Sequence, residues 1–378
     1  MKRTLLVTMD FAPMFGGVAN YWTNLNHFFP SDNFVVLAPE YDNSLDFDIK
    51  QNYLIYRKNL LTKNKWVWPK WLPLLFETIK LVRQEKIEKI IVANVLPVGT
   101  VAYIIKKFFR IPYIVSVHGL DIALPQAHTR KNRLMKKILN EAEHIITNSN
   151  FTKELLMKLE CCGADSVIIV YPCANINFEK PRQNILDTLA NGKLKDKKII
   201  LTVGRLIERK GQDKVIQSMP MILKECPDAV YVIVGQGKQL KYLKELVSML
   251  NLDEEVLFFC DVMNYELPGF YESADIFIMP SRRLENGDIE GFGIVYLEAN
   301  YYGKPVIGGK SGGAVEAVEH DVNGLLVDPL SINEISGAIV ELLKNPEKAN
   351  RLGETGRLRV AKKFNWFEQA KKVIDILN

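Results

Sequence analysis

The amino-acid sequence predicts an α/β protein that is built from two successive units, each with its own parallel sheet. The chain has 378 residues, of which 48% are hydrophobic, so it is long enough to form two separate cores. Short β-branched runs alternate along it with longer segments of helical spacing, as in parallel sheets. The alternation lapses in a polar stretch at residues 178–197 and then resumes, which indicates a linker between two units.

Six short apolar runs are the expected strands of the first unit. They lie at residues 4–9, 34–37, 89–93, 113–117, 144–148 and 167–171. Between the first two runs, apolar residues recur at intervals of three and four, which places them on one face of a helix. That face is formed by Val18, Tyr21, Trp22, Leu25, Phe28 and Phe29. We expect this face to pack on the sheet.

The second unit repeats the pattern. Its expected strands lie at residues 198–203, 230–234, 256–259, 276–279, 305–308 and 325–327. Amphipathic helices are expected around residues 240–250 and 332–342. In open α/β sheets, ligands bind beyond the carboxyl ends of the strands, so two such sheets predict a central cleft lined by strand-to-helix turns. The expected domains are residues 1–180 and 181–364, followed by a last segment at residues 365–378.

Charge, cysteines and apolar runs limit the expected environment. The net charge of +5 comes from the first half, because residues 1–180 hold 23 Lys and Arg against 16 Asp and Glu. Such a surplus attracts an anionic surface or an acidic substrate, and a solvated basic face is the competing interpretation. Five cysteines without metal spacing fit a reducing cytoplasm. The apolar run at residues 93–105 is too short to span a membrane, and the run at residues 4–9 is too short for a signal peptide.

The strongest local signal is the turn after the first strand of the second unit, which reads GRLIERKG at residues 204–211. Arg205 and Lys210 lie five residues apart in this glycine-bounded turn, so both cations can converge on one group. A diphosphate suits them, because Arg offers a planar fork and Lys a mobile point charge. An ordinary solvated basic turn is the competing interpretation.

The second signal is the segment EGFGIVYLE at residues 290–298, which follows a strand ending in MPSR. Gly291 and Gly293 let a ligand approach the backbone, and the free amides of the helix that starts there can bind phosphate. The carboxylates of Glu290 and Glu298 can accept hydrogen bonds from sugar or ribose hydroxyls. Without the neighbouring motifs, these two residues would read as a helix start and a solvated helix face.

Two weaker signals lie in the first unit. Gly16 and Gly17 follow the first strand and precede the first helix, where paired glycines permit backbone contact with phosphate or sugar. Any tight turn can also recruit glycine. His118, in VHGLD at residues 117–121, ends a strand at the expected edge of the cleft. A lone His is more often a structural residue than a catalytic one.

Several tempting motifs fail. GQG at residues 235–237 lacks the third glycine of a dinucleotide fingerprint. GKPVIGGKS resembles a P-loop, but Gly303 stands one residue too early, with Lys304 where the pattern needs glycine. Asp46 and Asp48 form a D-x-D in a polar loop without further ligands in view, which disfavours a metal-dependent transferase.

Taken in order, these motifs resemble the retaining GT-B glycosyltransferases of family four. They are DFAPMFGGVANY (10–21), VHGLD, GRLIERKG, MPSR (279–282) and EGFGIVYLE. The resemblance covers nearly the whole chain and looks closest to the phosphatidylinositol mannoside mannosyltransferases that use GDP-mannose, through FIMPSR, IEGFGIVYLEA and GGKSGGAVE (308–316). It implies two Rossmann-like domains facing a central cleft, the first on the acceptor side and the second on the donor side. It also implies a last helix that crosses back to the first domain.

The resemblance assigns roles to individual residues. Arg205 and Lys210 would neutralise the donor pyrophosphate, Glu290 would hold the transferred sugar, and Glu298 would hold the ribose. The implied donor-binding set is Gly16, Gly17, Arg205, Lys210, Glu290, Gly291, Phe292, Gly293, Ile294 and Glu298. The implied catalytic set is His118, Arg205, Lys210 and Glu290, with Asp10 and Tyr21 near the acceptor. Transfer would keep the anomeric configuration and would need neither a metal nor a cofactor.

Donor and acceptor differ in how much the sequence indicates. The resemblance favours GDP-mannose and a lipid or glycan acceptor. A UDP-sugar-dependent relative and a nucleotide-sugar epimerase are the alternatives, and nucleic acid is not an expected partner. Lysines alternate with Trp66, Trp68 and Trp71 at residues 63–71, and a similar mixture ends a helix at residues 106–110. Such surfaces can contact an anionic membrane, which predicts a cytoplasmic enzyme with peripheral membrane contact. Packing of these tryptophans between the domains competes with that interpretation.

Overall fold

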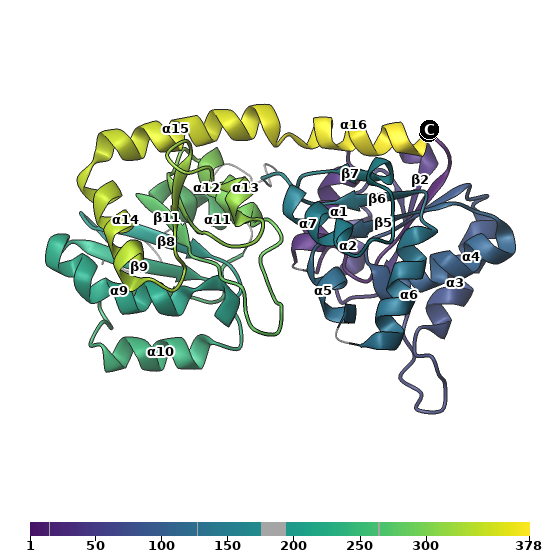
Figure 1. Cartoon of the computed structure of the whole chain (residues 1–378), viewed down its shortest axis with the longest axis horizontal. Helices are drawn as coiled ribbons and strands as arrows, with labels where there is room; N and C mark the ends of the chain where they lie inside the picture. The colour runs from purple at the N-terminus through teal and green to yellow at the C-terminus, as the bar shows by residue number, and fades with distance from the viewer. Residues whose placement is uncertain (15, 127, 175–193, 264) are drawn as a thin grey trace. The chain divides into compact units, whose positions relative to one another are not determined.

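The computed structural model describes residues 1–378 apart from residues 15, 127, 175–193 and 264. The described chain divides into two units (Figure 1). Unit 1 is Met1–Pro172 together with Trp366–Asn378, and unit 2 is Cys173–Asn365. The expected domain boundary at residue 180 lies outside the described residues.

Unit 1 contains a parallel sheet of seven strands in the order β3-β2-β1-β4-β5-β6-β7. The strands are β1 (Thr4–Val7), β2 (Phe34–Pro39), β3 (Leu54–Lys58), β4 (Lys89–Val92), β5 (Tyr113–Val117), β6 (His144–Thr147) and β7 (Val167–Ile169). Six were expected from the sequence, and β3 was not. Their apolar side chains fill the core because both faces of the sheet are covered.

The helices of unit 1 form two layers. They are α1 (Gly17–Asn26), α2 (Ser44–Asp48), α3 (Leu72–Gln84), α4 (Thr100–Phe109), α5 (Leu120–Gln126), α6 (Thr129–Asn140), α7 (Asn150–Met157) and α16 (Trp366–Leu377). Short turns η1 (Ser31–Asn33), η2 (Val95–Gly99) and η3 (Ala164–Ser166) join them. Helices α3, α4 and α6 pack together in one layer, whereas α16 packs on α1.

Unit 2 contains a parallel sheet of six strands in the order β10-β9-β8-β11-β12-β13. The strands are β8 (Lys198–Val203), β9 (Ala229–Val234), β10 (Val256–Phe259), β11 (Ile276–Met279), β12 (Val306–Gly309) and β13 (Gly324–Val327). All six were expected within a residue or two of these bounds. In both sheets, strands are added from the first strand toward one edge and then, from its other side, toward the opposite edge. This is the doubly wound strand order of Rossmann folds.

The helices of unit 2 also cover both faces of its sheet. They are α9 (Gln212–Glu225), α10 (Leu240–Met249), α11 (Leu267–Ser273), α12 (Ile294–Tyr301), α13 (Ala314–Ala317), α14 (Ile332–Lys344) and α15 (Pro346–Lys363), with the short turn η4 (Glu208–Lys210). Helices α10 and α14 pack on α9, and α12 packs on α13 and α15. In the described part of the chain, no helix is both long and apolar enough to cross a membrane.

The order of the strands locates the switch point of each sheet. In unit 1 it lies between β1 and β4, and in unit 2 between β8 and β11. Loops that leave the carboxyl ends of these neighbouring strands diverge to opposite faces and leave room for a ligand. Gly16 and Gly17 follow β1, and the GRLIERKG turn follows β8. The sequence motifs therefore lie at the places where this fold binds ligands.

Candidate functional site

The loops after β8 and β11 bring opposite charges together in unit 2. Lys210 Nζ lies 2.7 Å from Glu290 Oε2, and Arg209 Nη1 lies 2.5 Å from the same oxygen. Arg209 Nε is 3.0 Å from Asp288 Oδ1. The two cations are buried, although they belong to a polar turn. We call Arg209, Lys210, Asp288 and Glu290 the ion cluster.

The ion cluster fixes the protonation state of Glu290. Burial by itself raises the pKa of this carboxyl, but the charges of Lys210 and Arg209 outweigh burial and lower the pKa to about 2. Glu290 is therefore an anion at neutral pH. Burial lowers the pKa of Lys210, and the attraction of Glu290 opposes that effect. The carboxylate can accept further hydrogen bonds, because an ionised carboxylate has about four acceptor positions.

Arg209, and not the predicted Arg205, joins Lys210 on the Glu290 carboxylate. Arg205 was paired with Lys210 in the prediction, but its side chain is exposed. Its positive charge still contributes to lowering the pKa of Lys210, so it lies within electrostatic range. Arg209, which the sequence analysis did not select, is the second cation on Glu290. The sequence feature that could have identified Arg209 is its position next to Lys210 in the GRLIERKG motif.

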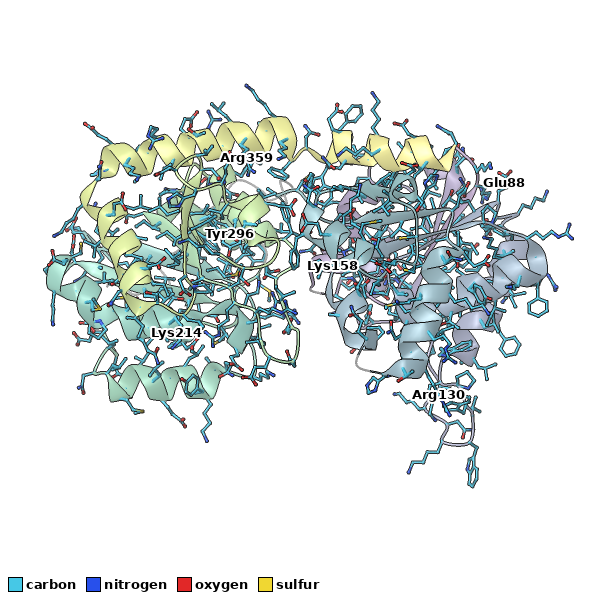
Figure 2. The ribbon with its side chains drawn as sticks, viewed as in Figure 1. Glu88, Arg130, Lys158, Lys214, Tyr296 and Arg359 are labelled. Atoms are coloured by element: carbon cyan, nitrogen blue, oxygen red, sulfur yellow. The ribbon has the colours of Figure 1, made fainter. Side chains whose placement is uncertain are left out.

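A glycine-led backbone turn lies beside the ion cluster. Gly293 precedes α12 with φ of 90°, a conformation that L side chains rarely adopt, and a Cβ there would lie 2.5 Å from the ring of Tyr296. The hydroxyl of Tyr296, which is labelled in Figure 2, donates to the Met279 carbonyl and ties α12 to the end of β11. Among the described residues, no side chain caps the start of α12. Its first amides, including that of Ile294, suit an anion.

A second glycine turn, at Gly313, packs against the turn that contains Gly291 and Gly293. Gly313 N–H donates to the Glu290 carbonyl over 2.8 Å. A Cβ on Gly313 would lie 1.9 Å from the carbonyl oxygen of Gly291, so the two backbones are in direct contact. The GGKSGG segment, part of the sequence that resembled a P-loop, therefore contacts the backbone of Glu290 and Gly291.

Phe292 and Glu298 lie deeper than the sequence suggested. The Phe292 ring is buried against Phe364, with ring centroids 5.5 Å apart. Glu298 is buried and accepts a hydrogen bond from the Tyr271 hydroxyl over 2.7 Å. Burial raises the pKa of Glu298, and the charge of Lys210 opposes that effect. Glu298 Oε2 therefore ties α12 to Tyr271 of α11.

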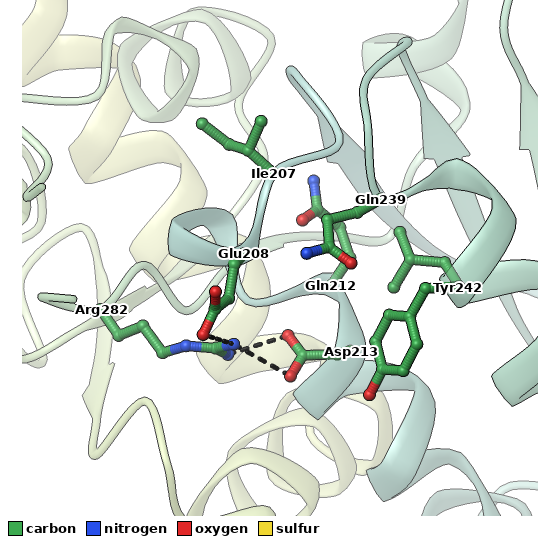
Figure 3. A pocket seen from close by; sticks show the side chains of 8 residues that line it. Ile207, Glu208, Gln212, Asp213, Gln239, Tyr242 and Arg282 are labelled. Atoms are coloured by element: carbon green, nitrogen blue, oxygen red, sulfur yellow. Dashed lines mark hydrogen bonds and ion pairs between the residues drawn. The ribbon is translucent and has the colours of Figure 1, made fainter. Parts of the chain in front are cut away.

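A cavity of about 300 Å³ lies in unit 2, and Ile207 and Glu208 of the GRLIERKG turn line part of it (Figure 3). Its polar wall is the ion pair between Arg282 and Asp213, with hydrogen bonds of 2.8 and 3.1 Å, and Glu208 lies 3.7 Å from the same arginine. Ile207, Gln212, Gln239, Tyr242 and Leu243 complete the lining. The Arg282 amide donates to the Arg209 carbonyl over 2.9 Å. The MPSR motif therefore braces the GRLIERKG turn.

His118 is the candidate of unit 1 that lies at the end of β5. Its Nε2 lies 3.1 Å from Ser116 Oγ, and its amide donates to Asp121 Oδ1 over 2.9 Å. Burial lowers the pKa of His118 to about 4, so the ring is neutral at pH 7. Burial also raises the pKa of Asp121 to about 6, against the backbone hydrogen bonds that lower it. A neutral imidazole can contact a sugar without adding charge.

Tyr21 packs under His118 instead of facing solvent. Its ring meets the His118 ring edge-on at 5.4 Å, and its hydroxyl donates to the Val170 carbonyl over 2.9 Å. The residue is buried, so the structure favours a packing role over the expected acceptor contact. Asp10 is half-buried, and burial raises the pKa of its carboxyl.

Gly16 and Gly17 keep an open surface at the start of α1. A Cβ on either glycine would meet no atom within 4 Å. Packing therefore does not demand glycine there, and close approach of a ligand remains a reason for the pair. Among the residues that the structure describes, no group of three or more His, Cys, Asp and Glu side chains gathers as a metal site.

Family models match both halves of the chain. Residues 15–178 match Glycosyltransferase Family 4, and residues 187–359 match Glycosyl transferases group 1. A GDP-mannose-dependent alpha-(1-6)-phosphatidylinositol monomannoside mannosyltransferase of Mycolicibacterium smegmatis is 28% identical over 99% of this chain and 98% of its own. An uncharacterized glycosyltransferase of Methanocaldococcus jannaschii is 30% identical over 72% of this chain and 70% of its own.

Solved structures match the fold over the whole chain. The Anabaena protein HepE, solved with UDP and glucose, has a TM-score of 0.83 at 20% identity, covering 100% of this chain and 99% of that one. Sucrose-phosphate synthase from Thermosynechococcus elongatus has a TM-score of 0.82 at 23% identity, covering 100% and 98%. With both family models matched and both sheets doubly wound, the chain belongs to the GT-B glycosyltransferases, joining a Family 4 first unit to a group 1 second unit.

Proposed function

We propose that this chain transfers mannose from GDP-mannose to a hydroxyl of a lipid or glycan acceptor and keeps the anomeric configuration. The observation that carries the proposal is the ion cluster beside the glycine-led start of α12, because it offers cations and free amides to a diphosphate. The GDP-mannose-dependent relatives, 27–29% identical over nearly the whole chain, favour this donor.

The proposed chemistry follows from where charge develops. Breaking the bond between sugar and phosphate leaves negative charge on the diphosphate and oxocarbenium character on the ring. Lys210 and Arg205 would stabilise the diphosphate, and each such donor can contribute about a hundred- to a thousandfold in rate. Glu290, an anion with a pKa of about 2, would accept hydrogen bonds from the sugar hydroxyls. His118 would contact the sugar as a neutral ring.

The acceptor would attack on the face that the diphosphate leaves. In this scheme the departing phosphate takes the proton of the acceptor hydroxyl, and no side chain is assigned as a covalent nucleophile. We further propose that the lysine and arginines take the role that a divalent metal plays in other transferases. If so, a chelator such as EDTA should leave the transfer rate unchanged, and loss of activity that Mg²⁺ restores would contradict this part.

The donor is tested by a thermal-shift panel of GDP-, UDP-, ADP- and dTDP-sugars. A true donor stabilises the folded protein by mass action, so GDP-mannose should raise the midpoint most. A UDP-sugar donor is the alternative, since HepE was solved with UDP and has the same fold. A larger shift with a UDP-sugar would replace the proposed donor by that alternative.

Retention is tested on the product. Transfer from GDP-mannose should give an α-linked mannoside, which the anomeric proton and carbon signals distinguish from a β-linked one. A β-linked product would overturn the proposed stereochemistry. The lipid acceptor is proposed because the related mannosyltransferases are named for phosphatidylinositol mannosides, and it requires contact with a membrane surface.

A further inference from the structure

Two tryptophans of unit 1 are exposed to an extent that packing does not explain. Trp66 is 93% exposed and Trp68 is 84% exposed. They lie in residues 59–71, which we call the tryptophan loop and which connects β3 to α3. Large aromatic side chains usually bury most of their surface in a core or an interface. A pair left almost wholly in water indicates a surface that meets a partner.

The tryptophan loop is held in shape by its own hydrogen bonds. Thr62 N–H donates to the Lys70 carbonyl over 2.9 Å, which closes the base of the loop. At the tip, Trp66 N–H donates to Asn64 Oδ1 over 3.0 Å. Trp71 packs against the core of unit 1 and anchors the end of the loop. Trp66 and Trp68 are therefore presented by an ordered scaffold, so ordering them on a partner costs little entropy.

The charge of the tryptophan loop selects the kind of partner. The loop contains Lys63, Lys65 and Lys70 and no acidic residue. The start of α6 adds the exposed Arg130, Lys131 and Arg133, and α6 has no acidic residue either. Arg130 is labelled in Figure 2. In the described residues, none of these six cations forms an ion pair with a carboxylate. Tryptophan with lysine is the combination that enters the interface of an anionic bilayer.

The topology places both groups at one edge of the sheet. The tryptophan loop follows the carboxyl end of β3, and α6 starts on the carboxyl side because it descends to the amino end of β6. Helix α4 packs between α3 and α6 in the same layer, so their starts lie about 20 Å apart. Gly16, Gly17 and His118 follow β1 and β5 at this same edge. A bilayer here would thus be near the candidate site of unit 1.

The second basic-aromatic segment differs in place and in partners. Phe108 is exposed at the end of α4, which lies toward the amino edge of the sheet because β5 begins after it. Lys106 pairs with Glu141 over 3.3 Å, and Lys107 Nζ lies 5.3 Å from the centre of the Tyr103 ring. These lysines already have partners within the chain. This segment therefore serves as a matched comparison.

We infer that the tryptophan loop and the start of α6 form a docking surface for an anionic lipid bilayer, with Trp66 and Trp68 inserted at the interface. The inference deepens the proposed function, since it names an anionic membrane as the place where the lipid acceptor is met. Attraction of lysines to anionic lipid weakens with salt, whereas insertion of tryptophan does not. Binding should therefore fall with ionic strength without vanishing.

The test is flotation of the complete chain with vesicles of phosphatidylcholine, alone or mixed with phosphatidylglycerol. The wild type should float with the mixed vesicles and stay in solution with phosphatidylcholine alone. Lys63→Glu with Lys65→Glu should lower partitioning about thirtyfold or more, given the contribution of each lysine near an anionic surface. Trp66→Ala with Trp68→Ala should lower it about tenfold. The control pair, Lys107→Glu with Phe108→Ala, should bind like the wild type.

Three outcomes would overturn the inference: equal binding to both vesicle types, no binding to either, or an equal loss in the control pair. Because the loop is exposed, the variants should keep the thermal midpoint of the wild type. If the tryptophan pair lowers the midpoint, the lysine pair still tests the inference. The thermal shift with GDP-mannose, measured on the same variants, separates this inference from the proposed function. If the protein binds vesicles but GDP-mannose gives no thermal shift, the docking surface stands and the proposed donor is rejected.

Discussion

Glu290 is a buried carboxylate whose charge depends on two cations. In the unfolded chain its pKa is near 4.5, and in the folded chain Lys210 and Arg209 outweigh burial and lower it to about 2. A lowered pKa in the folded state means that the stabilisation is complete above pH 4.5 and is lost as the pH falls through 2. Acid should therefore weaken unit 2 through this residue.

The pH dependence can be measured with Glu290→Gln. We expect the difference in unfolding free energy between wild type and variant to shrink by about 3 kcal/mol between neutral pH and pH 2, because a shift of one pKa unit corresponds to about 1.4 kcal/mol. Urea melts at stepped pH provide the measurement. Parallel pH profiles for the two proteins would show that the ion cluster does not hold Glu290 ionised.

Lys210 and Arg205 should separate catalysis from stability. Lys210 is buried on Glu290, whereas Arg205 is exposed. We expect Lys210→Ala and Arg205→Ala each to lower transfer by about a hundred- to a thousandfold. Lys210→Ala should also lower the thermal midpoint, because it removes one of two cations from a buried carboxylate. Arg205→Ala should leave the midpoint unchanged.

The control for these cations is Arg283→Ala. Arg283 is exposed on the loop after β11, close in sequence to the MPSR motif. The variant removes a positive charge from the same region and should retain both midpoint and transfer rate. Near-normal turnover of Lys210→Ala or Arg205→Ala would remove the diphosphate role from that residue.

At the scale of elements, the two glycine turns act as one backbone unit. We expect Gly313→Ala to destabilise unit 2 by about 1–3 kcal/mol, since its Cβ would lie 1.9 Å from the Gly291 carbonyl oxygen. The displaced turn should also weaken the thermal shift with GDP-mannose, because Gly291 leads to the start of α12. Chemical unfolding and the thermal-shift assay measure the two effects.

Gly337→Ala is the matched control for that substitution. Gly337 lies inside α14, and a Cβ there would meet no atom within 4 Å. Alanine favours the helix over glycine by up to about 1 kcal/mol, so this variant should be as stable as the wild type or more so. If Gly313→Ala were equally stable, the two turns would not be in the contact that the structure describes.

The strands that the sequence predicted are those with a continuous apolar run. The strands β8, β10 and β11 have the predicted bounds, because each is a short apolar run between polar turns. The strand β3 was missed, since LIYRK at the sheet edge is only partly buried and carries two cations. A half-exposed edge strand lacks the continuous apolar run that marks a central one.

The sequence predicted which segments form the candidate site, but not which side chains in them form pairs. The sequence pointed to the GRLIERKG and EGFGIVYLE turns, and Lys210 and Glu290 do meet. It did not indicate that Arg209 would be the buried cation or that Tyr271 would bind Glu298. Which of two neighbouring cations turns inward depends on the backbone of a short turn, and distant pairs depend on the packing of α11 against α12.

At the scale of the whole molecule, the two sheets share a topology and differ in the charges that follow the carboxyl ends of their strands. Unit 2 places two buried cations and two carboxylates there. Unit 1 places an open glycine pair after β1 and a neutral His118 after β5. This difference suits a division in which unit 2 holds the charged donor and unit 1 contacts neutral hydroxyls.

The last helix is a structural part of unit 1, although unit 2 precedes it in the sequence. The Leu377 carbonyl accepts from Lys2 N–H over 3.2 Å, and the Ile376 carbonyl accepts from the buried Lys89 Nζ over 2.8 Å. Gln369 Oε1 accepts from Tyr171 N–H over 2.9 Å. Helix α16 therefore connects the first strand, the fourth strand and the end of the unit.

Removing residues 366–378 should destabilise unit 1 and spare unit 2. We expect calorimetry to show one transition moved to lower temperature, because Lys89 would lose the Ile376 carbonyl and α1 would lose the apolar face of α16 that packs on it. The point variant Gln369→Ala should lower the stability of unit 1 by about 1–3 kcal/mol, since it removes the side-chain oxygen that accepts from the Tyr171 amide. Lys371→Ala, on the exposed face of the same helix, should have no effect. If the truncation shifted both transitions equally, α16 would not belong to unit 1 alone.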